Sequence, residues 1–175
     1  MTTSTSPERL RRTHPLTYVL AGGLVAGTLD IVYAMTFWAL KAEVSPLRIL
    51  QSVAEGLLGP PSFEGGIRTA MLGLALHYLI ALTMAVAYFL AARRWALLWR
   101  RPVAVGAAYG LALYVVMNYV VIPLSAASRG SPDPVWITLT VLVHVVLIGI
   151  PIALFVRLGL TRPAAGGREG SAESA

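Results

Sequence analysis

Four long apolar runs constrain this chain more than any other feature of its sequence. They cover residues 16–40, 67–92, 102–124 and 135–158. A helix needs about 20 apolar residues to cross a hydrocarbon core about 30 Å thick, and each run reaches that length. Only 13% of the residues are charged, against about a quarter in a soluble domain. The sequence therefore predicts an all-α integral membrane protein, a bundle of four transmembrane helices.

Basic residues are distributed unevenly between the two sides of such a bundle. The side of the N-terminus carries ten, at positions 9, 11, 12, 93, 94, 100, 101, 157, 162 and 168, and the opposite side carries four, at 41, 48, 68 and 129. Because Lys and Arg favour the cytoplasmic side, we expect a multi-pass protein of the inner (plasma) membrane with both termini cytoplasmic. The net charge of +6 then reflects topology. The expected partner is the lipid bilayer and not nucleic acid.

The remaining segments fall outside the four-helix membrane domain of residues 16–160, or connect its helices. Residues 1–15 and 161–175 are small and polar, which predicts disordered cytoplasmic tails. The outer segment 45–58 is predicted to be an amphipathic helix, with Ser45 as its N-cap, Pro46 at its first position and Gly59 after its end. Such a helix either lies in the membrane interface, which we favour, or folds over the mouth of the bundle.

Each apolar run contains one strongly polar side chain near its middle. Counted from the cytoplasmic helix ends at 1.5 Å per residue, all of them lie at a depth of about 20 to 24 Å. These binding or proton-handling candidates are Asp30, His77, Asn118 and His144. Small residues on the same helices predict close helix packing, and they are Gly23, Gly27, Gly73, Gly106 and Gly110. We therefore expect a central polar cluster to which all four helices contribute.

The four candidates differ in how strongly they indicate function. An ionised carboxylate that faced lipid would cost several kcal/mol, so Asp30 is expected to face the bundle interior and to have a functional role. Each histidine taken alone is more simply a hydrogen-bonded bundle residue. Asn118 is more simply an interhelical hydrogen-bonding residue.

Three functions are compatible with this pattern. The first is a small transporter or a proton- or ion-handling protein, with Asp30 as carrier and His77 and His144 as relay partners. Pro123 and Pro151 would permit local unwinding of their helices. Four helices are few for a transport path, so a homo-oligomer is expected. The second is a non-catalytic membrane subunit or assembly factor within a larger complex.

The third function is cofactor binding through the two histidines. His77 and His144 are placed to be axial ligands of a haem, or to form a two-histidine, one-carboxylate metal site with Asp30. Two histidines are the minimum for either site, and no local motif reinforces them, so no cofactor is otherwise expected. The chain has no cysteine and no Gly-x-Ser-x-Gly or His-Glu-x-x-His motif, so it is not expected to be a hydrolytic enzyme.

Three sequence blocks carry a resemblance to known proteins. They are GLVAGTLDIVYA, LQSVAEGLLGPPSFEGG and MNYVVIPLSA. Together they resemble a family of small, uncharacterised bacterial four-helix inner-membrane proteins, over most of the chain except its tails. The resemblance implies membrane location and topology, and it brings neither an activity nor site residues.

Overall fold

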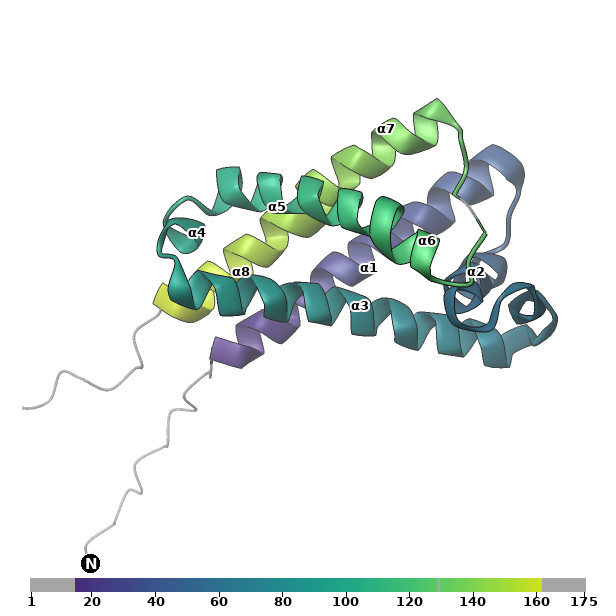
Figure 1. Cartoon of the computed structure of the whole chain (residues 1–175), viewed down its shortest axis with the longest axis horizontal. Coiled ribbons are helices and arrows are strands. Elements are labelled where there is room, and N and C mark those ends of the chain that lie inside the picture. The colour runs from purple at the N-terminus through teal and green to yellow at the C-terminus, as the bar shows by residue number, and fades with distance from the viewer. Residues whose placement is uncertain (1–14, 129, 162–175) are drawn as a thin grey trace, which may run out of the picture.

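The computed structural model of the chain describes residues 15–128 and 130–161, and within these ranges it is helical without any strand (Figure 1). Four helical stretches are long and apolar enough to cross a membrane, namely Pro15–Ala42, Gly66–Arg94, Pro102–Leu124 and Pro134–Thr161. The predicted all-α bundle of four membrane-spanning helices is thus confirmed. Large apolar side chains such as Leu79 and Leu90 face outward from it, as lipid contact requires.

The individual elements follow one another with short connections. Their order is α1 (Pro15–Ala42), α2 (Pro46–Leu58), η1 (Pro60–Glu64), α3 (Gly66–Arg94), α4 (Leu97–Arg100), α5 (Pro102–Val116), η2 (Met117–Val121), α6 (Ile122–Leu124), α7 (Pro134–Val143), η3 (His144–Gly149) and α8 (Ile150–Thr161). Both described ends of the chain lie at the end of the bundle that carries α4, and α2 lies at the opposite end (Figure 1). We call these the α4 end and the α2 end.

The helix boundaries have local causes that are visible in the sequence. Proline occupies the first turn of α2, α5 and α7, where its missing N–H is not needed. Ser45 caps α2 by accepting a hydrogen bond from the backbone N–H of Arg48. The predicted tails lie outside the described residues, except Pro15 and Thr161. Those two are helical and not disordered, because α1 and α8 extend to them.

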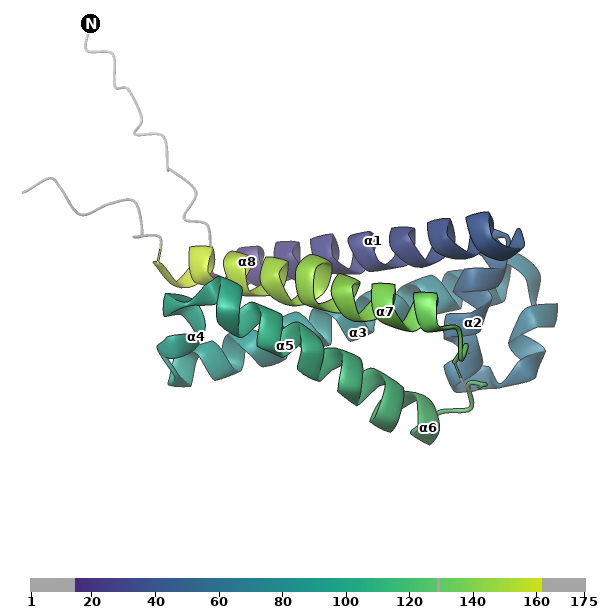
Figure 2. The ribbon, with the colours of Figure 1, turned by 90° about the horizontal axis from the view of Figure 1, so that it is seen from above.

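The spans pack in a chain of neighbours rather than a closed ring. α1 packs along α3 and α8, and α5 packs along α8 and η3. Toward the α2 end, α5 and α6 diverge from α7 (Figure 2). α3 and α5 meet near the α4 end, where the rings of Tyr88 and Tyr109 are 4.9 Å apart and Tyr109 donates a 2.8 Å hydrogen bond to the Met84 carbonyl. The bundle is therefore closed at the α4 end and splayed at the α2 end.

Buried apolar side chains are concentrated toward the α4 end. The core cluster includes Val19, Ala26, Tyr88, Phe89, Ile152, Ala153 and Val156. The hydroxyl of Tyr88 donates to the carbonyl of Leu98, which ties the core to α4. Close packing of this kind makes this half of the bundle the rigid part of the protein.

The five glycines predicted for helix packing lie against neighbouring helices. Gly23 and Gly27 face α3, and Gly106 and Gly110 face η3 and α8. Gly73 faces the backbone of α2, which is not a membrane span. The small-residue strip on α3 therefore holds the short helix between the first two spans.

Two of the four spans are interrupted by π-helical turns. They are η2 and η3, and they precede Pro123 and Pro151. Proline cannot donate a hydrogen bond to the carbonyl four residues before it, and its ring collides with that carbonyl. Those carbonyls belong to Tyr119 and Leu147, which lie inside η2 and η3. The wider turn accommodates each proline within a continuous helix.

Candidate functional site

The short helix α2 packs across α3 at a glycine. A Cβ atom on Gly73 would lie only 1.8 Å from the carbonyl oxygen of Leu50, so the two backbones are in direct contact. Gln51, only 2% exposed, donates a 3.1 Å hydrogen bond from Nε2 to the carbonyl of Gly66. α2 thus folds over this end of the bundle, the second of the two arrangements that its sequence allowed.

Two polar side chains of α2 are turned toward the bundle, while Arg48 and Ser52 of the same helix are exposed. These two, Gln51 and Glu55, are buried, whereas Leu57 and Leu58 are exposed. As a result, α2 presents polar groups to the interior of the bundle.

A cavity of about 730 Å³ lies at the α2 end of the bundle. Residues of α1, α3, η2, α6, α7 and η3 form its walls, and α2 with the connection between α6 and α7 lines the remainder. All four polar residues predicted from the sequence, Asp30, His77, Asn118 and His144, line it. The structure thus brings the four candidates to one cavity.

Asp30 lies on α1 and is half-buried. Its carboxylate forms no hydrogen bond or ion pair with any described residue. Both oxygens nevertheless remain accessible, because the only fully buried side-chain polar atom without a partner in the described chain is Ser62 Oγ. A carboxylate in a membrane span that faces a cavity without a partner is free to bind a proton or a cation.

The two histidines combine a structural contact with a free ring nitrogen. Nε2 of His77 lies 2.7 Å from the carbonyl oxygen of Gly27, and Nδ1 of His144 lies 2.9 Å from that of Thr140. A carbonyl only accepts, so these two nitrogens carry the hydrogens. In the neutral form of either ring, the other nitrogen is an acceptor.

Asn118 does not form the interhelical hydrogen bond that we expected. Its Nδ2 donates 2.9 Å to the carbonyl of Tyr114, one turn earlier in the same helix. Asn118 lies in η2 and His144 opens η3, so both side chains emerge from π-helical turns. Such turns are frequent at functional sites because they reorient single side chains.

The structure adds a second carboxylate that our sequence analysis did not select. Glu55 on α2 lines the same cavity and is 5% exposed. Ser128 Oγ donates to its Oε1 at 2.5 Å, and the neighbouring backbone N–H of Ala126 donates to the carbonyl of Gly56 at 3.0 Å. These contacts join α2 to the connection before α7. The sequence feature that could have identified this site residue is the presence of an acid, Glu55, among the apolar residues of a short helix.

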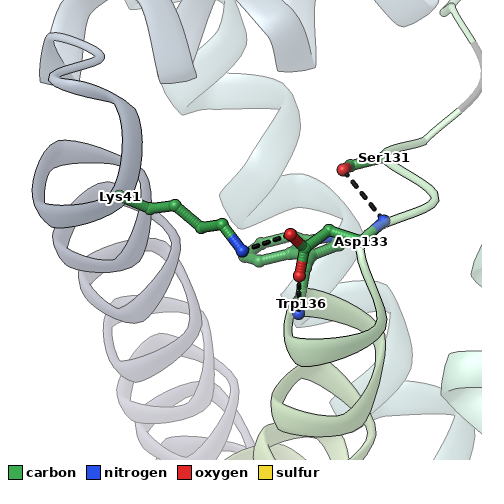
Figure 3. Close-up of polar contacts among 4 residues, drawn as sticks. All are labelled: Lys41, Ser131, Asp133 and Trp136. Atoms are coloured by element: carbon green, nitrogen blue, oxygen red, sulfur yellow. Dashed lines mark hydrogen bonds and ion pairs between the residues drawn. The ribbon is translucent and has the colours of Figure 1, made fainter.

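An ion pair joins the first and fourth spans at the α2 end. The Lys41 ammonium contacts the carboxylate of Asp133, which also caps α7 by accepting a hydrogen bond of 2.9 Å from the backbone N–H of Trp136 (Figure 3). Lys41, and then the Trp136 N–H, hold the pKa of Asp133 below its ordinary value of 3.8. Tyr33 stacks on the Trp136 ring at 5.4 Å, which continues the contact between the same helices.

The arrangement of ligand atoms was also compared with the two cofactor alternatives. Within the described ranges, no three His, Asp or Glu side chains come together closely enough to hold a metal ion. The two-histidine, one-carboxylate site with Asp30 thus gains no support from the geometry. Haem ligation by His77 and His144 stays a prediction.

Taken together, the four apolar spans and the partly polar cavity between them are those of a helical membrane protein with an internal cavity. Comparisons with protein-family models, with curated proteins and with solved structures found no match. The functional argument therefore depends on the site itself.

Proposed function

We propose that the protein binds a proton or a small cation at Asp30 and moves it across the membrane, as a small transporter or proton-handling protein. The supporting observation is the unpaired Asp30 carboxylate in a cavity that His77 and His144 also line. Glu55 in the same cavity supplies a second acidic group toward the α2 end, so the polar path is not confined to one layer.

The alternative of a non-catalytic subunit or assembly factor explains part of the site. Hydrogen bonds to the carbonyls of Gly27 and Thr140 are sufficient structural roles for His77 and His144. A structural role does not explain Asp30, because a carboxylate without a partner destabilises a bundle that it does not otherwise serve. Transport or proton handling is accordingly the function that the site supports best.

For the location, we propose the inner (plasma) membrane with both termini and α4 on the cytoplasmic side. The excess of Lys and Arg on that side of the sequence supports this orientation. The cavity would then open toward the external side, near α2. A homo-oligomer or a larger membrane complex would complete a path that four helices alone form only in part.

The test is a flux measurement in proteoliposomes that contain a pH-sensitive dye, with a pH gradient imposed across the membrane. We expect the wild-type protein to collapse the gradient and Asp30→Asn to abolish this activity, because the amide cannot take up a proton. Thr28→Val is the control, since Thr28 lies on the same helix, outside the cavity, and hydrogen-bonds to the hydroxyl of Tyr78. A fully active Asp30→Leu variant, or an inactive wild-type protein, would contradict the proposal.

A further inference from the structure

The hydrogen-bonding groups around Asp30 share one property, which is a free acceptor. In their neutral forms, His77 retains Nδ1 and His144 retains Nε2 as acceptors, because the other nitrogen of each ring donates to a backbone carbonyl. Asn118 uses Nδ2 and retains its carbonyl oxygen. With the two oxygens of Asp30, the layer offers acceptors to a ligand that donates hydrogen bonds and carries positive charge.

Inorganic metal ions fit this layer poorly. Mg²⁺ and Ca²⁺ require six or more oxygen ligands, and transition metals require several clustered side chains. The described residues contain no cluster of three His, Asp or Glu that could hold a metal ion. A bare proton, in turn, needs no cavity of about 730 Å³.

Apolar side chains form much of the remaining cavity wall. Leu76, Ile80 and Met84 line it from α3, and Val121 and Ile122 line it from the splayed helix pair η2 and α6. These residues line the cavity at the end of the bundle where α5 and α6 diverge from α7 (Figure 2). A ligand that fills this space therefore has an apolar body beside its charged group.

Basic side chains do not oppose this ligand at the Asp30 layer. Among the described residues that line the cavity, Arg48 is the only Lys or Arg. It is exposed, and its guanidinium lies 4.6 Å from the centre of the Phe63 ring at the α2 end. Two carboxylates, Asp30 and Glu55, face the same space.

We infer that the cavity binds an organic cation, an ammonium group on an apolar body, with the ammonium at Asp30 and the body against Leu76, Ile80 and Met84. This inference rests on the proposed function and specifies its substrate class. The free acceptors select the ammonium, and the apolar wall selects the body.

Calorimetric titration of the full chain in lipid nanodiscs tests the charged half of the ligand. The probes are hexylammonium, the uncharged hexan-1-ol and the oppositely charged hexanoate. We expect hexylammonium to bind tightest. Asp30→Asn should weaken its binding by about ten- to a hundredfold, the range for a lost charge-assisted hydrogen bond, and should leave hexan-1-ol unchanged. The control Thr28→Val should bind hexylammonium as the wild type does.

Methylammonium tests the apolar half. Each buried methylene strengthens binding by about fourfold, so methylammonium should bind far more weakly than hexylammonium. Ile80→Trp fills the apolar part of the cavity and should weaken hexylammonium while sparing methylammonium. Leu79→Trp is the matched control, because Leu79 is 60% exposed on the outer face of the same helix.

The outcomes separate this inference from the proposed function. Hexylammonium that binds no better than hexan-1-ol overturns the substrate class, while proton flux that still depends on Asp30 keeps the proposed function. Equal binding by wild type and Asp30→Asn, together with flux that does not depend on Asp30, overturns both. Selective binding of hexylammonium that is lost in both Asp30→Asn and Ile80→Trp supports the inference.

Discussion

Replacement of Gly73 by alanine tests the position of α2, on which the shape of the cavity depends. In an ordinary helix, Gly→Ala stabilises by about 1 kcal/mol. At Gly73 the new Cβ would lie 1.8 Å from the carbonyl oxygen of Leu50, whereas Cβ atoms essentially never approach within 3.0 Å of another atom. The atom in the way belongs to a backbone, so no rotamer change relieves the contact. α2 must move away by about 1 Å or more, which also disturbs the hydrogen bond from Gln51.

The size of the effect follows from two opposing terms. Overpacking costs about 1–3 kcal/mol, and a contact with a backbone lies at the upper end of that range. After the gain in helix propensity, we expect Gly73→Ala to destabilise the protein by about 2 kcal/mol, or roughly 5 °C in melting temperature. Gly56→Ala is the matched control, because its Cβ would meet Ser125 at an ordinary 3.8 Å. That variant should melt at or slightly above the wild-type temperature.

Thermal melting in detergent measures both variants, and limited trypsin digestion reports on α2 directly. Arg48 lies within α2, so cleavage after it requires the helix to detach and fray. We expect faster cleavage there in Gly73→Ala and unchanged cleavage in Gly56→Ala. If the two alanine variants had equal melting temperatures and equal cleavage rates, the contact between α2 and α3 would not exist as described.

Two further predictions concern the α2 end and the topology. Because Lys41 lowers the pKa of Asp133, the ion pair stabilises the fold above the ordinary pKa of 3.8, and this contribution is lost as pH falls through the lower folded value. Asp133→Asn, which keeps the N-cap, should therefore melt below wild type at pH 6, and the difference should shrink as the pH falls below 3.8. A difference that does not shrink in acid would contradict this prediction. The chain has no cysteine, so single substitutions report the topology without background. In intact cells Ser131→Cys should react with a membrane-impermeant maleimide and Ala96→Cys should not, and the reverse labelling would invert the proposed orientation.

The spans and their boundaries could be predicted because they depend on local properties. An apolar run of about 20 residues is long enough to cross a membrane as a helix. Pro102 and Pro134 mark helix starts, because proline fits the first turn of a helix but not its interior. The shared depth of Asp30 and His144 follows from counting residues along each helix, which needs no knowledge of packing. Their common cavity is consistent with that count.

The remaining features of the site depend on contacts between distant segments. Gly73 indicates close helix packing, but the amino-acid sequence does not show whether a membrane span or a short helix packs against it. The inward orientation of Glu55 depends on the packing of α2 against α3 and on the hydrogen bond from Ser128.

The cavity itself follows from the order of residue sizes along one face of α5. Gly106 and Gly110 lie one turn apart, and both bring α5 into backbone contact with η3. One turn later Tyr114 replaces glycine, and its ring meets the edge of the His144 ring at 5.6 Å between centres. Two glycines followed by an aromatic residue thus hold α5 close to η3, and the larger ring then spaces it from α7, from which it diverges toward the α2 end (Figure 2). The next residue on that face is Asn118, which opens onto the space so created. The order of residues along this face of α5 therefore accounts both for the close packing toward the α4 end and for the cavity toward the α2 end.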